Sequence, residues 1–217
     1  MTARLSVNEI DVLIGKVNIL SKFSIRVGDG EMVGLIGRNG AGKTTLLRTI
    51  LGILHPKQGD IQFQGCSLLG VATNARAQLG IGYMPEDRGL IGALTVRQNL
   101  AIPVWARKLD DLEERIARVC EIVPELNQFM NSPALSLSGG QQKLVALGRA
   151  LMCGSKMLLL DEPFEGVSPV LSQRLVEAVG RARDEGVTIL LAQSDRKGRE
   201  SDFDRVVFIE RGANVYE

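Results

Sequence analysis

Aromatic residues, histidine and cysteine are scarce in this sequence. Phe, Trp and Tyr make up 4% of the 217 residues, and His55 is the only histidine. A single histidine excludes a histidine-based metal site or catalytic triad, and its place beside a proline favours a surface loop. The three cysteines, Cys66, Cys120 and Cys153, are widely spaced and lack metal-ligand patterning. We therefore expect reduced, buried thiols in a cytosolic protein.

Long apolar runs and an excess of one charge are also missing. No stretch approaches the roughly 18 apolar residues of a membrane span, and no charged and then apolar leader opens the chain. The 26 Lys and Arg residues nearly balance the 25 Asp and Glu residues. This balance leaves neither a basic stripe for nucleic acid nor a polybasic membrane patch. We expect a cytoplasmic protein that binds no nucleic acid and reaches a membrane only through a partner.

A glycine-rich segment follows the apolar run at 32–36 and precedes a helical pattern at 43–51. It reads G-x-x-x-x-G-K-T and consists of Gly37, Arg38, Asn39, Gly40, Ala41, Gly42, Lys43 and Thr44. Glycines let backbone N–H groups approach a triphosphate, and the helix N-terminus adds positive partial charge. In such a P-loop Lys43 reaches the β- and γ-phosphates, Thr44 binds Mg²⁺ and Thr45 touches the α-phosphate. The alternative is a plain glycine turn.

A second glycine motif, Leu137-Ser138-Gly139-Gly140-Gln141, lies about a hundred residues downstream, before another helical pattern. Taken alone, it could be only a loop that precedes an amphipathic helix. Together with the P-loop it makes the chain resemble the ATP-binding-cassette (ABC) ATPases, whose signature is LSGGQ. The resemblance implies that the residues at 138–141 complete the ATP site of an opposite subunit, with the helix dipole behind them.

A third motif is the apolar run Met157 to Leu160, which ends in the adjacent carboxylates Asp161 and Glu162. A leucine-rich run of this kind is typical of a central parallel strand, and alone it indicates only a strand that meets its solvated loop. In the resemblance it is the Walker B strand. Asp161 would then hold Mg²⁺, and Glu162 would polarise the attacking water as general base.

Four positions depart from the general ABC pattern. Ile14 stands where an aromatic residue usually stacks on adenine, so it offers the base an apolar contact without a π-face. Glu86 replaces the usual glutamine that touches Mg²⁺ and the attacking water, and a carboxylate there repels the γ-phosphate unless the metal screens it. Ser168 replaces the D-loop aspartate. Ser194 falls at the position of the switch histidine, where it can donate a hydrogen bond but carries no charge.

Periodicity predicts the elements that carry these motifs. Strands are expected at 4–9, 19–27, 32–36, 60–64, 80–84, 187–193 and 205–209, and helices at 43–51, 95–107, 110–123, 124–129 and 169–183. Within the helical stretch we interpret Trp105 as an apolar anchor, and Glu113 and Glu114 with Arg118 as solvated ion pairs.

The resemblance implies an α/β fold of the P-loop NTPase, ABC ATPase type. It has a mixed parallel core sheet, N-terminal antiparallel strands and a helical signature subdomain. A single domain over 1–217 is expected. Residues 1–86 and 151–217 would form the core subdomain with Walker A and Walker B, and residues 87–150 the helical subdomain that ends in the signature.

Within that family the chain is similar to the ATPase subunits of branched-chain amino-acid importers, a group shared by urea and amide importers. The similarity is to the F-type subunit of the pair, and it rests on the segments 82–88, 94–100, 148–152 and 161–171. It implies an ATP- and Mg²⁺-dependent ATPase on the inner face of the cell membrane. Its partners would be a second, non-identical ABC ATPase subunit arranged head to tail, integral membrane permease subunits and, indirectly, a periplasmic or extracellular solute-binding protein.

Two other functions stay open at this point. A non-transport ABC ATPase acting on ribosomes or DNA would carry a second cassette or a long coiled-coil insertion, and the chain has neither. A degenerate, regulatory nucleotide-binding subunit is favoured by Ile14, Ser168 and Ser194, whereas the intact Walker residues argue against it.

Overall fold

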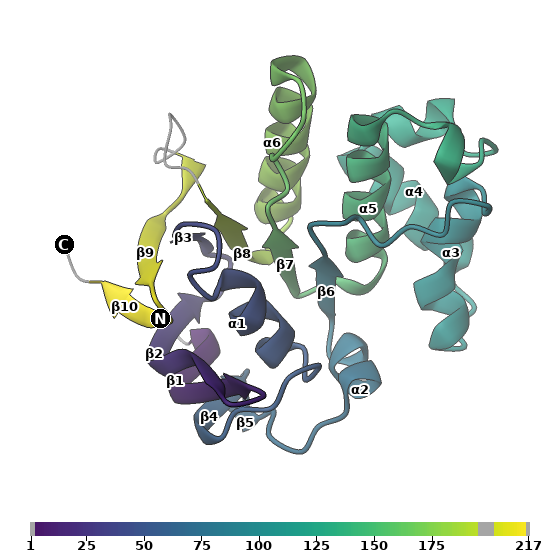
Figure 1. Ribbon diagram of the computed structural model, residues 1–217. Helices are drawn as coiled ribbons and strands as arrows, with labels where there is room; N and C mark the ends of the chain where they lie inside the picture. The colour runs from purple at the N-terminus through teal and green to yellow at the C-terminus, as the bar shows by residue number, and fades with distance from the viewer. Residues whose placement is uncertain (1–2, 195–201, 216–217) are drawn as a thin grey trace.

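The computed structural model describes residues 3–194 and 202–215, which form two β-sheets and a block of helices (Figure 1). The expected α/β architecture is confirmed. The strands, which the next paragraphs place in their sheets, are β1 (Ala3–Ile14), β2 (Val17–Gly28), β3 (Met32–Ile36), β4 (Gln58–Phe63), β5 (Cys66–Ser67), β6 (Ile81–Met84), β7 (Met157–Asp161), β8 (Thr188–Gln193), β9 (Arg205–Glu210) and β10 (Ala213–Val215).

The first sheet has four antiparallel strands in the order β2-β1-β4-β5. Both β1 and β2 are longer than the alternation predicted. β1 continues past Glu9, where the expected strand ended, and β2 extends by two residues before and one residue after the expected 19–27. Glu9 and Lys22 have positive φ values of 45° and 46°. In β1 the buried positions then change from Leu5 and Val7 to Ile10 and Val12. An extra residue of this kind breaks the period of two while it keeps the apolar side chains on one face.

The second sheet has six strands in the order β10-β9-β3-β8-β7-β6. Its neighbours from β9 to β6 pair in parallel, and only β10 runs antiparallel to its partner. The carboxyl ends of these parallel strands therefore meet at one edge of the sheet. In open α/β sheets this edge is where ligands bind.

The central strands are buried on both faces. In β7, Met157 and Leu159 belong to a core formed with α1 (Lys43–Ile50) and the antiparallel sheet, whereas Leu158 and Leu160 belong to a core formed with the helical block. Because successive side chains point to opposite faces, one uninterrupted apolar strand serves both cores. This is why the run at 157–160 reads as leucine-rich and not as alternating.

The helical block lies beside the six-stranded sheet and away from the antiparallel one (Figure 1). It comprises α3 (Val96–Ala106), α4 (Leu112–Ile122), α5 (Gly139–Cys153) and two 3₁₀ turns, η1 (Pro124–Gln128) and η2 (Ala134–Ser136). The long α6 (Pro169–Asp184) follows the signature-bearing α5 and β7. The expected subdomain boundary at residue 150 falls inside α5, which continues to Cys153. The division into two subdomains stays a prediction.

Short α2 (Thr73–Gln78) was not predicted, because six residues give too little periodicity to recognise. It carries Arg76, which is only 3% exposed and whose guanidinium donates hydrogen bonds to main-chain carbonyls of Thr49, Ile50, Leu68 and Val71. Two of these carbonyls belong to the end of α1, where a helix lacks intrahelical donors. Arg76 thus ties α2 to the helix that follows the glycine-rich loop.

Two expectations about charged and aromatic side chains are wrong. Trp105 is 55% exposed and therefore does not anchor the helical block. Arg118 forms its ion pair with Glu185, at 2.8 Å, while Glu113 pairs with Arg97. Both ion pairs join residues far apart in the sequence, so spacing along one helix does not reveal them.

The cysteines are free, as expected, but they are not all buried. Cys66 is exposed, whereas Cys120 and Cys153 are half-buried and burial raises the pKa of each of these two thiols. His55 lies in an exposed loop, as its sequence context predicted. No helix of the described residues combines the length and the apolar character needed to cross a bilayer.

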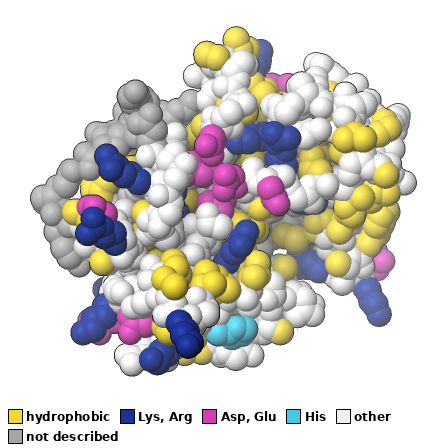
Figure 2. Space-filling model, viewed as in Figure 1, with side chains coloured by type: hydrophobic (Ala, Val, Ile, Leu, Met, Phe, Trp, Pro, Cys, Tyr) yellow, Lys and Arg dark blue, Asp and Glu magenta, His cyan; other side chains and the backbone are white. Residues whose placement is uncertain are grey.

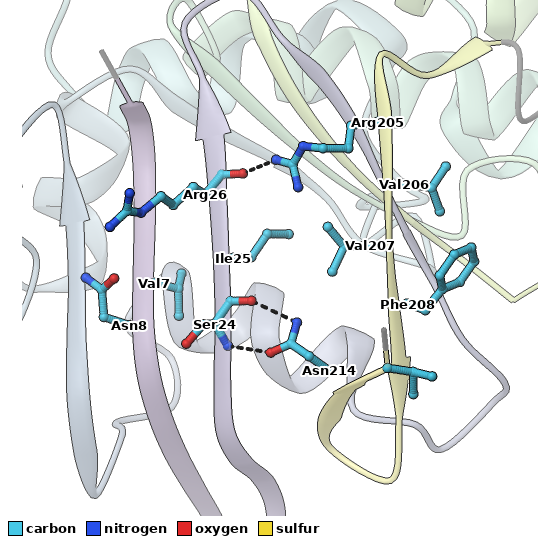
Figure 3. A pocket seen from close by; sticks show the side chains of 11 residues that line it. Val7, Asn8, Ser24, Ile25, Arg26, Arg205, Val206, Val207, Phe208 and Asn214 are labelled. Carbon is cyan, nitrogen blue, oxygen red and sulfur yellow. Dashed lines mark hydrogen bonds between the residues drawn. The ribbon is translucent and has the colours of Figure 1, made fainter. Parts of the chain in front are cut away.

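The two sheets are joined at the open edge of β2, beside a crevice of about 640 Å³ (Figure 3). There the side chain of Asn214 accepts a hydrogen bond from the Ser24 amide at 2.8 Å and donates one to the Ser24 carbonyl at 2.9 Å. Arg205 donates to the carbonyl of Arg26. These side chains occupy hydrogen-bonding groups that an added strand would use, so they protect the edge.

Candidate nucleotide-binding site

The glycine-rich loop connects the buried strand β3 to helix α1, as the sequence predicted. Gly40 and Gly42 have positive φ values of 80° and 111°, which favour glycine. A Cβ atom at Gly37 would lie 2.3 Å from the carbonyl oxygen of Ile209, so the close approach of β9 also requires glycine there. The loop therefore turns tightly into the amino end of α1, where free N–H groups are available to a phosphate.

Lys43, the first residue of α1, has a buried side chain that bends back over the loop. Its Nζ donates to the carbonyl of Gly37 at 2.6 Å and lies 3.0 Å from Oε1 of Glu162. Both side chains of this ion pair are 6% exposed. A buried ammonium must be paired, and these contacts hold the charge beside the loop.

Asp161 ends β7 and is completely buried. Its two carboxylate oxygens accept hydrogen bonds from the hydroxyls of Thr44 and Tyr83, each at 3.2 Å. Burial raises the pKa of Asp161, although the two hydrogen bonds oppose the shift, and the carboxylates of Glu86 and Glu162 raise it further. Sequence reasoning missed Tyr83. Only the pairing of β6 with β7 brings this residue to Asp161, and the sequence does not reveal that pairing.

Glu162 follows directly and adopts a positive φ of 47°, which is uncommon for a residue with a side chain. Its Oε2 accepts hydrogen bonds from the amide of Ser194 at 3.1 Å and from the Ser194 hydroxyl at 3.3 Å. The carboxylate is thus held between Lys43 and Ser194. The structure brings together the three residues predicted to be catalytic, although their roles stay predictions.

Two cavities flank the loop. One, of about 390 Å³, is lined by Lys43, Thr44, Thr45, Glu86 and Glu162, with Ile19, Asn39, Gly40 and Gly42. The other, of about 760 Å³, is lined by residues 36–41, Ser194 and part of β9. Ile14, at the end of β1, is 50% exposed and is not among the residues that line either cavity. Its contact with a base stays a prediction, and Ile19 is an apolar lining residue that sequence reasoning missed.

Acidic side chains gather near the middle of the face seen in Figure 2, where Figure 1 shows the ends of β6 and β7. The residues proposed to bind Mg²⁺ are Thr44, Asp161 and Glu86. In sites of this kind the metal takes one or two carboxylates together with substrate phosphates. Among the described residues, no cluster of three or more His, Cys, Asp or Glu side chains forms an all-protein metal site. The Thr44 hydroxyl, the buried Asp161 carboxylate and the nearby Glu86 fit a site in which the protein and the phosphates of the nucleotide hold Mg²⁺ together.

The signature motif forms the N-terminal cap of α5. The Ser138 hydroxyl accepts from the Gln141 amide at 3.3 Å, and the Gln141 side chain accepts from the Ser138 amide at 2.9 Å. This reciprocal pair is a capping box. It occupies the side-chain oxygen of Gln141, and the binding of a phosphate by the amides of Gly139 and Gly140 stays a prediction. Both capping residues line a separate cavity of about 580 Å³, with Ser168 and Leu171 at the start of α6.

Comparison with known proteins agrees with this geometry. Residues 20–165 match the sequence pattern of the family described as ABC transporter, and this range includes all three motifs. The chain belongs to the ABC transporter family. As a member, it is a nucleotide-binding ATPase of the type that is coupled to transport.

Individual ABC proteins are similar over most of the chain. A protein described as the high-affinity branched-chain amino acid transport ATP-binding protein BraG, from Pseudomonas aeruginosa, is 36% identical over 97% of this chain and 91% of its own length. The lipopolysaccharide export ATP-binding protein LptB of Escherichia coli is 33% identical over 89% of this chain and 81% of its own length. The probable branched-chain amino acid transport protein LivF of Archaeoglobus fulgidus is 30% identical over 83% of this chain and 77% of its own length.

Solved structures confirm the ABC ATPase fold. A nucleotide-free ATP-binding cassette from an ABC transporter superposes with a TM-score of 0.89 and 27% identity, and covers 99% of this chain and 90% of the other. The ADP conformation of MJ1267, an ATP-binding cassette of an ABC transporter, gives a TM-score of 0.88 and 26% identity over the same shares.

Proposed function

We propose that this chain is the ATP-hydrolysing subunit of an ABC importer for branched-chain amino acids or related amides and urea. The similarity to BraG and LivF supports this class of solute. The similarity to LptB, which is named for export, favours a second candidate, the ATPase of an exporter. The membrane permease, and for an importer a solute-binding protein outside the membrane, would be separate chains. The proposed place of the subunit is the cytoplasmic face of the membrane.

The observation that carries the proposal is the separation of the motifs. Walker A and Walker B residues line the two cavities that flank the loop, whereas Ser138 and Gln141 line a third, separate cavity. A second cassette arranged head to tail would bring its signature to the loop of this chain. Mg-ATP bound there would supply the negative charge and the metal that favour the closed pair, because only closure brings both sets of N–H donors to it.

Within this chain, different residues would bind the phosphates, hold the metal and activate the attacking water. Lys43 would leave Gly37 and Glu162 to bind phosphate oxygens, and Thr44 with Asp161 would hold Mg²⁺. Once Lys43 has moved, the Glu162 carboxylate is free to accept a proton from the attacking water, with Ser194 orienting it. The strained backbone at Glu162 is consistent with a functional position.

Apolar surface on the helical block supports permease docking. Trp105 and Leu135 in the block are 55% and 77% exposed, and Ile91, in the loop before α3, is 50% exposed. Figure 2 shows apolar side chains gathered over this block. Exposed apolar surface of this kind is typical of an interaction site. The neighbouring Glu86 segment would transmit closure of the ATPase pair to the permease.

Substitution of Glu162 by Gln tests the proposed reaction. Gln keeps the shape but cannot act as a base, so turnover should fall at least about 100-fold while ATP-dependent dimerisation with the partner subunit persists. Light scattering and phosphate release measure the two properties. Glu121→Gln, at an exposed position of α4, is the control and should behave as wild type. Failure of Glu162→Gln to dimerise in ATP, or wild-type turnover by this variant, would contradict the proposal.

We further propose that the two ATP sites of the assembled pair are unequal. Ser194 bonds to Glu162 but carries no positive charge, and the Ser168 hydroxyl caps α6. The site on this chain should therefore hydrolyse ATP more slowly than the site on a non-identical partner. Single-turnover hydrolysis, with the Walker lysine replaced in one subunit at a time, measures each site. Equal rates at the two sites would refute the inequality.

A further inference from the structure

Lys143 is a buried cation for which the reaction outlined above has no role. It lies in the second turn of α5, the helix whose amino end is the signature motif, and it is 4% exposed. Removing an ammonium group from water is costly unless it is well paired. A lysine at a surface position needs no explanation beyond solubility, but a buried lysine must have partners that stabilise its charge.

The partners of Lys143 lie in the turn that follows β7. Its Nζ donates to the carbonyl of Glu162 at 2.8 Å and to the carbonyl of Glu165 at 2.5 Å. The amide of Glu165 in turn donates to the Glu162 carbonyl at 3.3 Å, which closes the turn. One side chain of the signature helix thus holds both ends of the turn that begins with the proposed base.

This contact acts on a strained residue. Glu162 has a φ of 47°, and its carboxylate is held by Lys43 and Ser194. Unusual backbone conformations persist only where their surroundings determine them. By holding the carbonyl of the same residue, Lys143 restricts the main chain of Glu162 and so restricts the direction in which the carboxylate can point.

The charge of Lys143 also faces the acidic part of the site. Burial lowers the pKa of Lys143, while the carboxylates of Glu165, Glu162 and Glu86 oppose that shift and Arg88 adds to it. The hydrogen bonds of the ammonium go to main-chain carbonyls, and its charge acts on these carboxylates, two of which, Glu86 and Glu162, line the cavity beside the loop.

We propose that Lys143 is a positioning residue that links the signature helix to Glu162. The amino end of this helix, at Gly139 and Gly140, would contact the nucleotide of the partner. One turn later, Lys143 of the same helix holds the main chain of Glu162, the base for this chain's own nucleotide. The link gives the two ATP sites a continuous physical connection. It rests on the proposed role of Glu162.

Substitution of Lys143 by Met removes the donor and the charge while it keeps an unbranched apolar stem. A base displaced by about 1 Å costs up to roughly 100-fold in rate. We expect kcat of the assembled ATPase pair to fall between about 10- and 100-fold, and the affinity of the chain for a fluorescent ATP analogue to stay within about twofold. Lys57→Met, at an exposed lysine before β4, is the matched control and should change neither value.

A double-mutant cycle separates positioning from a merely structural role. If Lys143 acts through Glu162, then Lys143→Met should slow single-turnover hydrolysis of Glu162→Gln by no more than about twofold, because the base is already absent. A further loss of 10-fold or more in that background would overturn the proposal. Unchanged kcat in Lys143→Met would overturn it as well.

Two remaining outcomes also decide the matter. Lys143→Gln retains a hydrogen-bond donor without the charge and is measured in parallel. Loss of ATP binding in both Lys143 variants would assign the residue to maintenance of the fold and overturn the proposal. Wild-type turnover by the Glu162→Gln single variant would show that Glu162 is not the base, and it would remove the basis of the proposed reaction and of the proposed role of Lys143. If the losses in turnover from Lys143→Met and Glu162→Gln instead add up in the double variant, only the proposal for Lys143 fails and the role of Glu162 stands.

Discussion

Asp161 illustrates, at the scale of one residue, how this site trades stability for function. The carboxyl is fully buried and has hydroxyl donors from Thr44 and Tyr83, yet burial raises its pKa. A raised pKa means that the folded chain binds this proton more tightly than the unfolded chain does. The free energy of unfolding contributed by Asp161 is therefore highest at low pH and decreases as pH rises through the raised pKa.

Substitution of Asp161 by Asn should stabilise the protein in the absence of nucleotide. Asn removes the cost of a buried negative charge, and the two hydroxyls can rotate to suit its amide. We expect a gain of about 1 kcal/mol at neutral pH, which raises the melting temperature by about 2–4 °C. The same variant should lose Mg²⁺-dependent hydrolysis. Calorimetry and phosphate release measure the two effects, and a lower melting temperature than wild type would contradict the argument.

Residues of the site differ in how well the sequence predicts them. Lys43, Thr44, Asp161 and Glu162 follow from motifs in which the chemistry requires a fixed spacing, and the structure brings all four together. Tyr83 and Lys143 belong to no such motif. Each reaches the site from a neighbouring element, so its place depends on strand pairing or helix packing that no local pattern encodes.

The helices and strands also differ in how well the sequence predicts them. The strand at 32–36 was predicted to the residue, because a short apolar run between turn signals leaves few alternatives. β1 was predicted to end at Glu9, because the irregularity there looks like the end of a strand in the sequence. The small helix α2 was missed, although Arg76 makes it part of the support of α1.

Substitution of Arg76 by Met tests that support. The guanidinium contacts four carbonyls in a buried setting, and its loss leaves them without these donors. We expect the free energy of unfolding to fall by about 3 kcal/mol. Chemical denaturation measures the change. Arg97→Met, in α3, removes a side chain that is 43% exposed; it is the control and should change stability by less than about 0.5 kcal/mol. An equal loss in both variants would refute a supporting role of Arg76.

At the scale of the whole molecule, the main feature is that the glycine-rich loop and the signature motif lie apart, and in the proposed function each supplies one half of a nucleotide site. The loop at 37–44 lies at the carboxyl edge of the central sheet, and the signature lies at the amino end of α5 in the helical block. Sequence motifs identify both halves but give no orientation. That the two halves line separate cavities is evident only from the folded chain.

Substitution of Gly139 by Asp separates the two halves experimentally. Gly139 begins α5, where a carboxylate interacts favourably with the helix dipole, and an added Cβ would lie 3.2 Å from the flexible guanidinium of Arg88. Stability should therefore stay within about 0.5 kcal/mol of wild type, and the chain should bind ATP normally through its own loop. The negative charge should nevertheless repel the phosphates of a partner's nucleotide and prevent ATP-dependent dimerisation. Gly139→Asn, uncharged and of equal size, is the control. Titration with a fluorescent ATP analogue and light scattering measure the two properties, and weakened ATP binding by the isolated Asp variant would show that the signature acts on the nucleotide of its own chain.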